Sequence, residues 1–156
     1  MSPLPVSIIG LGLMGEVYAT RLIAAGIPVR GFDIDPARRA RLERIGGISV
    51  DSIAATLATP SRCILLAVFS TDQVEDVVDR HVLPASDLTS NAILVCTTTA
   101  DPDRIAELAA RVTDRGISFL DVPVSGTSDQ VRRGDGVALI GGDPAIAAQL
   151  ADIFDA

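Results

Sequence analysis

The sequence has no lysine and no tryptophan, only one histidine and two cysteines, and few aromatic side chains (3% of 156 residues). All 13 of its basic residues are arginines. A mechanism that requires a lysine side chain therefore cannot be completed by these residues. The lone histidine, His81, lies near Pro84 with no cysteine or second histidine close to it. We expect His81 at the surface or in a loop, and we expect no metal site.

Each cysteine lies inside a short apolar run that contains β-branched residues. Cys63 precedes one such run and Cys96 ends another. This pattern predicts two buried strand positions, with reduced thiols in the core rather than a disulfide or a metal site.

Long hydrophobic runs and an excess of positive charge are also missing. The longest unbroken apolar run, Cys63–Phe69, is far shorter than the ~20 residues of a membrane-spanning helix. The N-terminal residues Met1–Pro5 lack the basic start and apolar stretch of a signal peptide, so we expect a cytoplasmic location. With 20 acidic and 13 basic residues, the net charge is −7, which argues against nucleic acid and anionic lipid as partners.

The hydrophobic content, in contrast, is high. At 48% hydrophobic residues, the chain can bury enough surface to fold, and its length fits one domain. Short apolar runs alternate with segments of helical period, which predicts a doubly wound α/β fold with a mainly parallel sheet and helices on both faces. The runs expected to be strands are Val6–Ile9, Val29–Phe32, Ile64–Val68, Ile93–Cys96, Ser118–Leu120 and Val137–Ile140.

Helix starts are marked by capping residues. Three Asp-Pro pairs each offer an N-cap acceptor followed by a proline at the first helical position, namely Asp35-Pro36, Asp101-Pro102 and Asp143-Pro144. The last of these predicts a helix over Pro144–Phe154. Ser70 and Gln73 can form a capping box for a helix that reaches about Arg80. A first helix is expected over Leu13–Ala25, with Gly26 as its stop.

A glycine motif stands between the first expected strand and the first expected helix. It reads Gly10-Leu11-Gly12-Leu13-Met14-Gly15 and matches the dinucleotide-binding fingerprint. In that fingerprint one glycine allows the tight turn, one allows the backbone to approach the pyrophosphate, and one allows the helix to pack on the strand. The alternative is an ordinary glycine turn, but the strand before it and the helix after it favour dinucleotide binding.

Asp33 ends the second expected strand, 18 residues after Gly15. This is close to the ~20-residue spacing at which an acidic residue accepts hydrogen bonds from the adenosine ribose hydroxyls, which favours NAD. A 2′-phosphate would be repelled by the carboxylate unless Arg38 or Arg39 compensated for it. NADP is therefore the minority alternative.

Four motifs together resemble a known family. They are the glycine motif, Thr98-Thr99 followed by Pro102, the segment Asp121–Gly126, and Gly134 with Gly141-Gly142. In this order and spacing they are similar to the β-hydroxyacid dehydrogenases, a Rossmann-like family that includes 3-hydroxyisobutyrate dehydrogenase and 6-phosphogluconate dehydrogenase. The resemblance implies an NAD-dependent oxidoreductase that acts on a 3-hydroxy acid or its semialdehyde.

The resemblance also implies site residues. Ser125, Gly126 and Thr127 match the segment that holds the carboxylate end of the substrate, and a loop of small polar residues can present N–H groups to an anion. A plain strand-to-loop turn is the alternative for this segment. Thr99 falls near the nicotinamide end of the cofactor. The full cofactor set that we expect is Gly10, Leu11, Gly12, Leu13, Met14, Gly15, Asp33, Ile34, Val68, Phe69 and Thr99.

Departures from the family cluster around the substrate segment. Thr127 stands where a second glycine is common, Gln130-Val131 replaces Gly-Ala, and Asp135-Gly136 replaces Thr-Leu. Phe69 stands where proline is frequent. These changes leave cofactor binding intact but put the identity of the hydroxy acid in doubt.

The family's general acid/base is a lysine in a second, helical domain, and residues 1–156 contain neither. We therefore expect a dinucleotide-binding domain that binds cofactor without turnover and has no catalytic residue of its own.

Asp121 could point into a ligand crevice, but we expect it to fix a turn through backbone hydrogen bonds. Two alternatives remain open: a non-catalytic dinucleotide-binding or sensing module, and an imine-reductase-like enzyme. Homo-oligomers would form through the helical domain, and the chain alone could self-associate.

Overall fold

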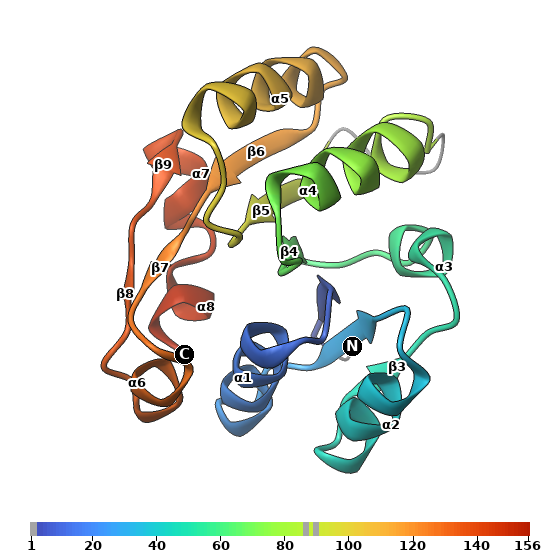
Figure 1. Ribbon diagram of the computed structural model, residues 1–156, viewed down its shortest axis with the longest axis vertical. Helices are drawn as coiled ribbons and strands as arrows, with labels where there is room; N and C mark the ends of the chain where they lie inside the picture. The colour runs from blue at the N-terminus through green and yellow to red at the C-terminus, as the bar shows by residue number, and fades with distance from the viewer. Residues whose placement is uncertain (1–2, 86–87, 89–90) are drawn as a thin grey trace.

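The computed structural model describes residues 3–85, 88 and 91–156, and it is built around one seven-stranded sheet (Figure 1). Met1 and Ser2, the start of the N-terminal stretch considered above, lie outside the described residues. The order of strands is β3-β2-β1-β4-β5-β6-β9. Their bounds are β1 Val6–Ile9, β2 Val29–Phe32, β3 Ile48–Ser49, β4 Ile64–Leu66, β5 Ile93–Cys96, β6 Ser118–Asp121 and β9 Gly141–Gly142.

All strands of this sheet are parallel except β9, which pairs antiparallel with β6. From β1 the chain winds outward through β2 and β3, then returns to β4 and winds the other way through β5 and β6. The winding direction reverses between β1 and β4. In such sheets ligands bind at the carboxyl ends of the strands on either side of the reversal. The expected doubly wound, mainly parallel Rossmann-like fold is confirmed.

Helices cover both faces of the sheet (Figure 1). Buried side chains of α1, α2 and the last two helices pack on one face, and those of α3, α4, η1 and α5 pack on the other. The bounds are α1 Leu13–Ala24, α2 Pro36–Arg44, α3 Ile53–Leu57, α4 Thr71–Val77, the π-helix η1 Val78–Val82, α5 Pro102–Asp114, α6 Ser128–Arg133, α7 Pro144–Ala148 and α8 Ala151–Asp155.

The strand predictions hold best in the centre of the sheet. The bounds of β1, β2 and β5 are as expected, whereas β4 ends at Leu66 instead of Val68. The predicted strand Val137–Ile140 is wrong as a single element. Its first half is β8 (Val137–Ala138), which pairs with β7 (Val124–Ser125) in a separate two-stranded ribbon. Leu139 and Ile140 lie between β8 and β9 and are about half exposed.

The helix starts follow the sequence closely. Each of the three Asp-Pro pairs caps a helix, with the aspartate side chain accepting from the backbone of the first turn. The expected helix over Pro144–Phe154 is instead two short helices, α7 and α8. Ser70 accepts from Gln73 as expected, but the Gln73 side chain accepts from the Phe69 N–H, so the capping box is not closed.

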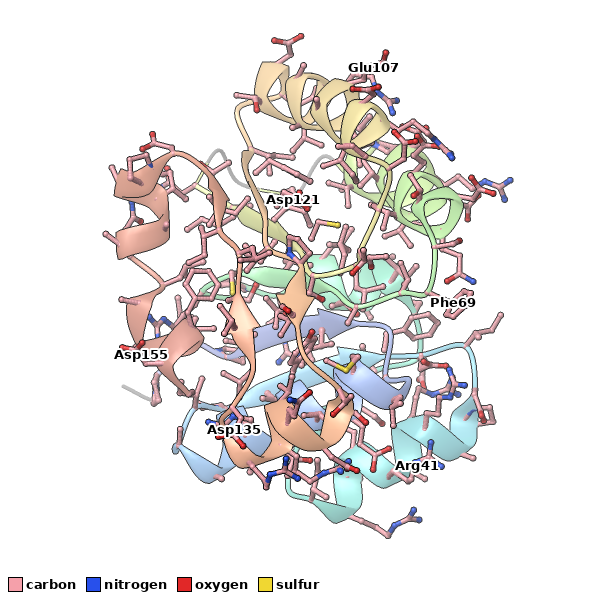
Figure 2. All side chains as sticks on the ribbon, turned by 60° about the vertical axis from the view of Figure 1, so that its left-hand side comes forward. Arg41, Phe69, Glu107, Asp121, Asp135 and Asp155 are labelled. Carbon is pink, nitrogen blue, oxygen red and sulfur yellow. The ribbon has the colours of Figure 1, made fainter. Side chains whose placement is uncertain are left out.

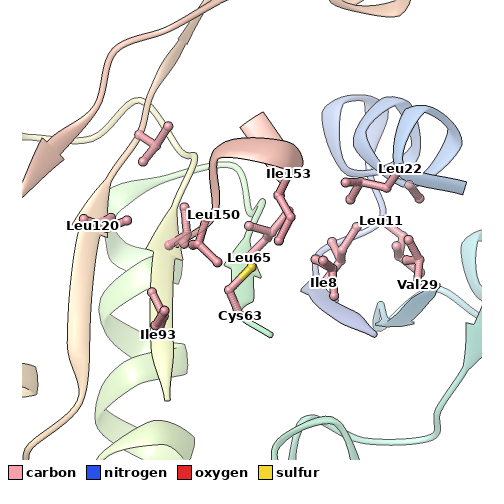
Figure 3. Packing of buried hydrophobic residues seen from close by; sticks show 14 of the residues in the cluster. Ile8, Leu11, Leu22, Val29, Cys63, Leu65, Ile93, Leu120, Leu150 and Ile153 are labelled. Carbon is pink, nitrogen blue, oxygen red and sulfur yellow. The ribbon is translucent and has the colours of Figure 1, made fainter. Parts of the chain in front are cut away.

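The positions of His81 and of the two cysteines can be compared with those expected from the sequence. His81 lies in η1 and is partly buried, so the expected loop position is wrong. Cys63 packs in the cluster beneath α1 and α8 (Figure 3), and Cys96 packs in the cluster on the opposite face. Both thiols are buried and free, as expected. Burial raises the pKa of Cys63 to about 12 and that of Cys96 to about 11.

One ion pair fastens the end of the chain to the sheet. The Arg62 guanidinium, just before β4, donates to both carboxylate oxygens of Asp152 on α8, at 2.5 and 2.6 Å. It also donates to the Gln149 carbonyl. This hydrogen bonding holds the pKa of Asp152 below its ordinary value. The fork geometry of arginine makes such a pair more specific than a single contact.

We predict that Asp152→Asn lowers the urea midpoint of unfolding at pH 7 more than Asp155→Asn on the same helix does. Because the pKa of Asp152 is lowered in the folded state, the ion pair stabilises fully above the ordinary carboxyl pKa of about 3.9 and is lost as the pH falls below it. The difference between wild type and Asp152→Asn should therefore shrink below about pH 4. Urea titrations between pH 3 and pH 7 measure this, and a difference independent of pH would contradict it.

Candidate functional site

The glycine motif forms the turn between β1 and α1, at the reversal of the sheet. Gly10 has a φ of +97°, and a Cβ there would lie 2.5 Å from the Ala67 carbonyl oxygen. A Cβ on Gly15 would lie 2.0 Å from the Gly10 carbonyl oxygen. A Cβ on Gly12 would meet only the Arg38 guanidinium, at the ordinary contact distance of 3.6 Å. Gly10 and Gly15 are therefore required by the packing of the turn, whereas Gly12 is not.

Asp33 holds this loop in place. The N–H of Leu11 donates to Asp33 Oδ2 at 2.8 Å, and the N–H of Asp35 donates to Oδ1 at 2.8 Å. The residue is only 5% exposed. Sequence reasoning assigned Asp33 to a ribose and missed its contact with the loop. The spacing that identified the residue carries no signal for that contact.

Two arginines lie beside Asp33 but in different ways. Arg39 donates to the Asp33 carbonyl oxygen at 2.7 Å, and its guanidinium lies over the Phe32 ring. Arg38 donates to the Asp33 carboxylate at 3.3 Å and remains 42% exposed, next to Gly12. Of the two, Arg38 is therefore the cation that faces the open side of the glycine loop.

Exposed apolar side chains surround the same edge of the sheet. Leu13, Ile34 and Phe69 follow β1, β2 and β4, three adjacent strands, and are 68%, 87% and 92% exposed. Phe69 projects from the surface in Figure 2. Met14, by contrast, is partly buried. Apolar side chains left in solvent at a ligand-binding edge are suited to contact the flat rings of a bound molecule.

The ends of β4 and β5 are tied together by Thr98. Its hydroxyl donates to the Val68 carbonyl oxygen at 2.8 Å, and the residue is buried. This bond fixes the backbone of Val68 and leaves the neighbouring Thr99 exposed. Thr98 is a positioning residue that the sequence reasoning did not assign, although the Thr-Thr pair was part of the resemblance.

The expected substrate segment lies between β7 and α6. Ser125 ends β7, Gly126 has a φ of +132°, and Thr127 is the N-cap of α6. All three residues are exposed. Helix α6 packs beside α1 (Figure 1), where Arg21 donates to the Arg132 carbonyl oxygen at 3.1 Å. The segment is therefore attached to the helix that follows the glycine loop.

A cavity and two side chains with raised pKa values lie outside the glycine loop and the substrate segment. A cavity of about 150 Å³ between α1, α6 and α8 is lined mainly by apolar residues, together with Tyr18, Arg21, Thr97 and Asp155. Burial raises the pKa of Tyr18, and it also raises the pKa of Asp121 at the end of β6. No described residue gives the Asp121 carboxylate the turn hydrogen bond that we expected. Within residues 3–85, 88 and 91–156, no group of three metal-ligating side chains exists.

The chain matches one family model over residues 5–156, described as the NAD binding domain of 6-phosphogluconate dehydrogenase. Among curated relatives, an L-threonate dehydrogenase of Escherichia coli O6:H1 is 30% identical over 97% of this chain and 50% of its own length. Human mitochondrial 3-hydroxyisobutyrate dehydrogenase is 31% identical over 95% of this chain and 44% of its own length. The chain thus spans about half the length of these relatives.

Solved structures share the fold. A Mycobacterium tuberculosis 3-hydroxyisobutyrate dehydrogenase, solved with L-serine, superposes with a TM-score of 0.90 at 21% identity, over 99% of this chain and 52% of its own. A protein named Psf3, in complex with NADP⁺, has a TM-score of 0.85 at 26% identity, over 96% and 54%. An imine reductase variant from Myxococcus stipitatus, in complex with NAD⁺, has a TM-score of 0.84 at 20% identity, over 98% and 51%.

None of the described helices is long and apolar enough to cross a membrane. The fold, the glycine loop and the match over residues 5–156 agree with one another. The chain therefore belongs to the family of the NAD-binding domain of 6-phosphogluconate dehydrogenase, and the two curated relatives named above are hydroxyacid dehydrogenases.

Proposed function

We propose that this chain is the cofactor-binding part of an oxidoreductase that transfers hydride between a nicotinamide cofactor and a 3-hydroxy acid or its semialdehyde. The observation that carries the proposal is the glycine loop, which the Asp33 carboxylate holds open at the reversal of the sheet. The two curated relatives, whose names are those of hydroxyacid dehydrogenases, support the substrate class.

The residues present fit a dinucleotide. We assign the pyrophosphate to Gly12 and the first amides of α1, where no Cβ blocks the backbone and the helix N-terminus favours an anion. The exposed side chain of Ile34 is assigned to the adenosine end, and Val68, Phe69 and Thr99 are assigned to the nicotinamide end. When bound, the nicotinamide gives or takes the hydride.

Proton transfer calls for a group that these residues do not supply. The resemblance assigns this role to a lysine, and the sequence has none. A missing general acid costs about 10²–10⁴ in rate. We therefore propose that the 156-residue chain binds cofactor with little or no turnover, and that the substrate carboxylate is received by the segment Ser125–Thr127. Oxidation of a 3-hydroxy acid at an ordinary enzymatic rate by this chain would contradict the proposal.

The charge around the glycine loop bears on the choice between NAD and NADP. The Asp33 Oδ1 accepts one described hydrogen bond, and a carboxylate oxygen can accept two, so Oδ1 can also accept from a ribose hydroxyl. The buried negative charge would repel a 2′-phosphate. Arg38 offsets this charge only in part, because Asp33 shares the Arg38 guanidinium with the carboxylate of Asp35. We therefore propose NAD as the preferred cofactor.

Calorimetric titration of the chain with NAD, NADH, NADP and NADPH tests the proposal. We expect NAD and NADH to bind, and the phosphorylated forms to bind about tenfold more weakly or worse, since one unfavourable charge contact is worth about 1.4 kcal/mol or more. Failure of all four to bind would contradict a dinucleotide-binding role.

Substitutions at two glycines should distinguish a loss of dinucleotide binding from a loss of stability. Gly12→Ala meets no atom closer than 3.6 Å, so it should leave the melting temperature nearly unchanged while it abolishes dinucleotide binding. Gly15→Ala places a Cβ 2.0 Å from the Gly10 carbonyl oxygen and should lower the melting temperature as well. Thermal unfolding and calorimetry on both variants measure this. Unimpaired NAD binding by Gly12→Ala would show that the pyrophosphate does not lie there.

A matched pair of variants tests the cofactor preference. Asp33→Asn keeps the size of the side chain but removes its charge, so NAD binding should weaken about tenfold while NADP binding does not. Arg38→Gln should do the opposite and weaken NADP more than NAD. Dissociation constants for both cofactors, with melting temperatures to monitor the Leu11 contact, provide the readout. Equal losses for both cofactors in Asp33→Asn would contradict the assignment to the ribose.

A further inference from the structure

Thr127 and Gln130 hold each other through two hydrogen bonds. The Thr127 N–H donates to Gln130 Oε1 at 2.8 Å, and the Gln130 N–H donates to the Thr127 hydroxyl oxygen at 3.2 Å. This is a closed capping box, in contrast to the open one at Ser70. The backbone donor of Thr127 is therefore already engaged by a side chain of the same chain.

Gly126 is enclosed by the same side chain and by the chain that returns from α6. A Cβ on Gly126 would lie 3.6 Å from Gln130 Cβ, 3.7 Å from Gln130 Oε1 and 3.5 Å from the Gly136 Cα. A Cβ on Gly136 would lie 2.7 Å from Val131 Cγ2. Residue 136 therefore has no room for a side chain beside Val131.

The far end of α6 is fixed as well. The Arg21 guanidinium lies 3.3 Å from the position of a Cβ on Gly134, which has a φ of +85° and ends the helix. Its bond to the Arg132 carbonyl satisfies one of the acceptors that the helix end leaves open. With the capping box at one end and Arg21 at the other, α6 is fixed at both ends, and the segment Ser125–Thr127 leads into its N-terminal end.

We propose that Gln130 is a positioning residue for the substrate segment. This rests on the function proposed above. By occupying the Thr127 N–H, the Gln130 side chain leaves Ser125 and Gly126 as the exposed groups that receive the carboxylate of a small hydroxy acid. The backbone N–H of Val131 also donates to the Thr127 carbonyl oxygen, at 2.9 Å, so Thr127 is held by its own helix through three hydrogen bonds.

The test begins with amide hydrogen exchange on the ¹⁵N-labelled 156-residue chain. Gln130→Ala should speed exchange of the Thr127 N–H about tenfold, the effect of losing one hydrogen bond of ordinary strength. Gln130→Glu should restore slow exchange, because glutamate also closes a capping box. Arg133→Ala, on the same helix, is the control and should leave the Thr127 N–H unchanged. An exchange rate that is the same in wild type and Gln130→Ala would overturn the proposal.

The second arm titrates L-threonate and 3-hydroxyisobutyrate into the NAD-loaded chain and follows the amide resonances of the segment. In wild type, Ser125 and Gly126 should shift while Thr127 does not, and in Gln130→Ala the Thr127 resonance should shift too. A Thr127 shift as large as that of Gly126 in wild type would overturn the role of Gln130. No shift anywhere in the segment with either acid would instead overturn the proposed substrate site, whatever the exchange rates show.

Discussion

The buried hydrogen bond between the Leu11 N–H and the Asp33 carboxylate is the constraint on which the site depends. Three of the six residues of the glycine loop have no side chain, and only Leu11 of the other three is buried in the core. A carboxylate from the neighbouring strand fixes the loop, at 2.8 Å and away from solvent. A charged acceptor makes this bond stronger than one between neutral groups. Strand β2 thereby sets the position of the loop that follows β1.

The parts of the fold that sequence reasoning found are those that a local pattern determines. The bounds of β1, β2 and β5 follow from continuous apolar runs, and three helices begin where an Asp-Pro pair caps them. The run Val137–Ile140 is equally apolar, yet only Val137–Ala138 forms a strand, and this strand pairs with β7 rather than with the main sheet. Apolar content identifies a strand but not the sheet to which it belongs.

In the candidate site, too, the features that a local sequence pattern determines could be predicted, and those that depend on contacts between distant residues could not. The glycine motif could be predicted from spacing, because its three glycines lie within six residues between a strand and a helix. The loop contact of Asp33 and the tie between Thr98 and Val68 join residues 22 and 30 positions apart. No periodicity carries such information. The capping box of α6 did have a local signal, a threonine three residues before a glutamine, and it was readable from the sequence.

The two buried thiols lie in different layers of the molecule. Cys63 belongs to the cluster under α1 and α8, and Cys96 belongs to the cluster under α4 and α5. With pKa values raised to about 12 and about 11, neither is a thiolate while its layer is closed. Each sulfur therefore becomes available to a thiol reagent only when its own helices lift from the sheet. The chain thus carries one natural reporter of local opening on each side of its central sheet, without any introduced label.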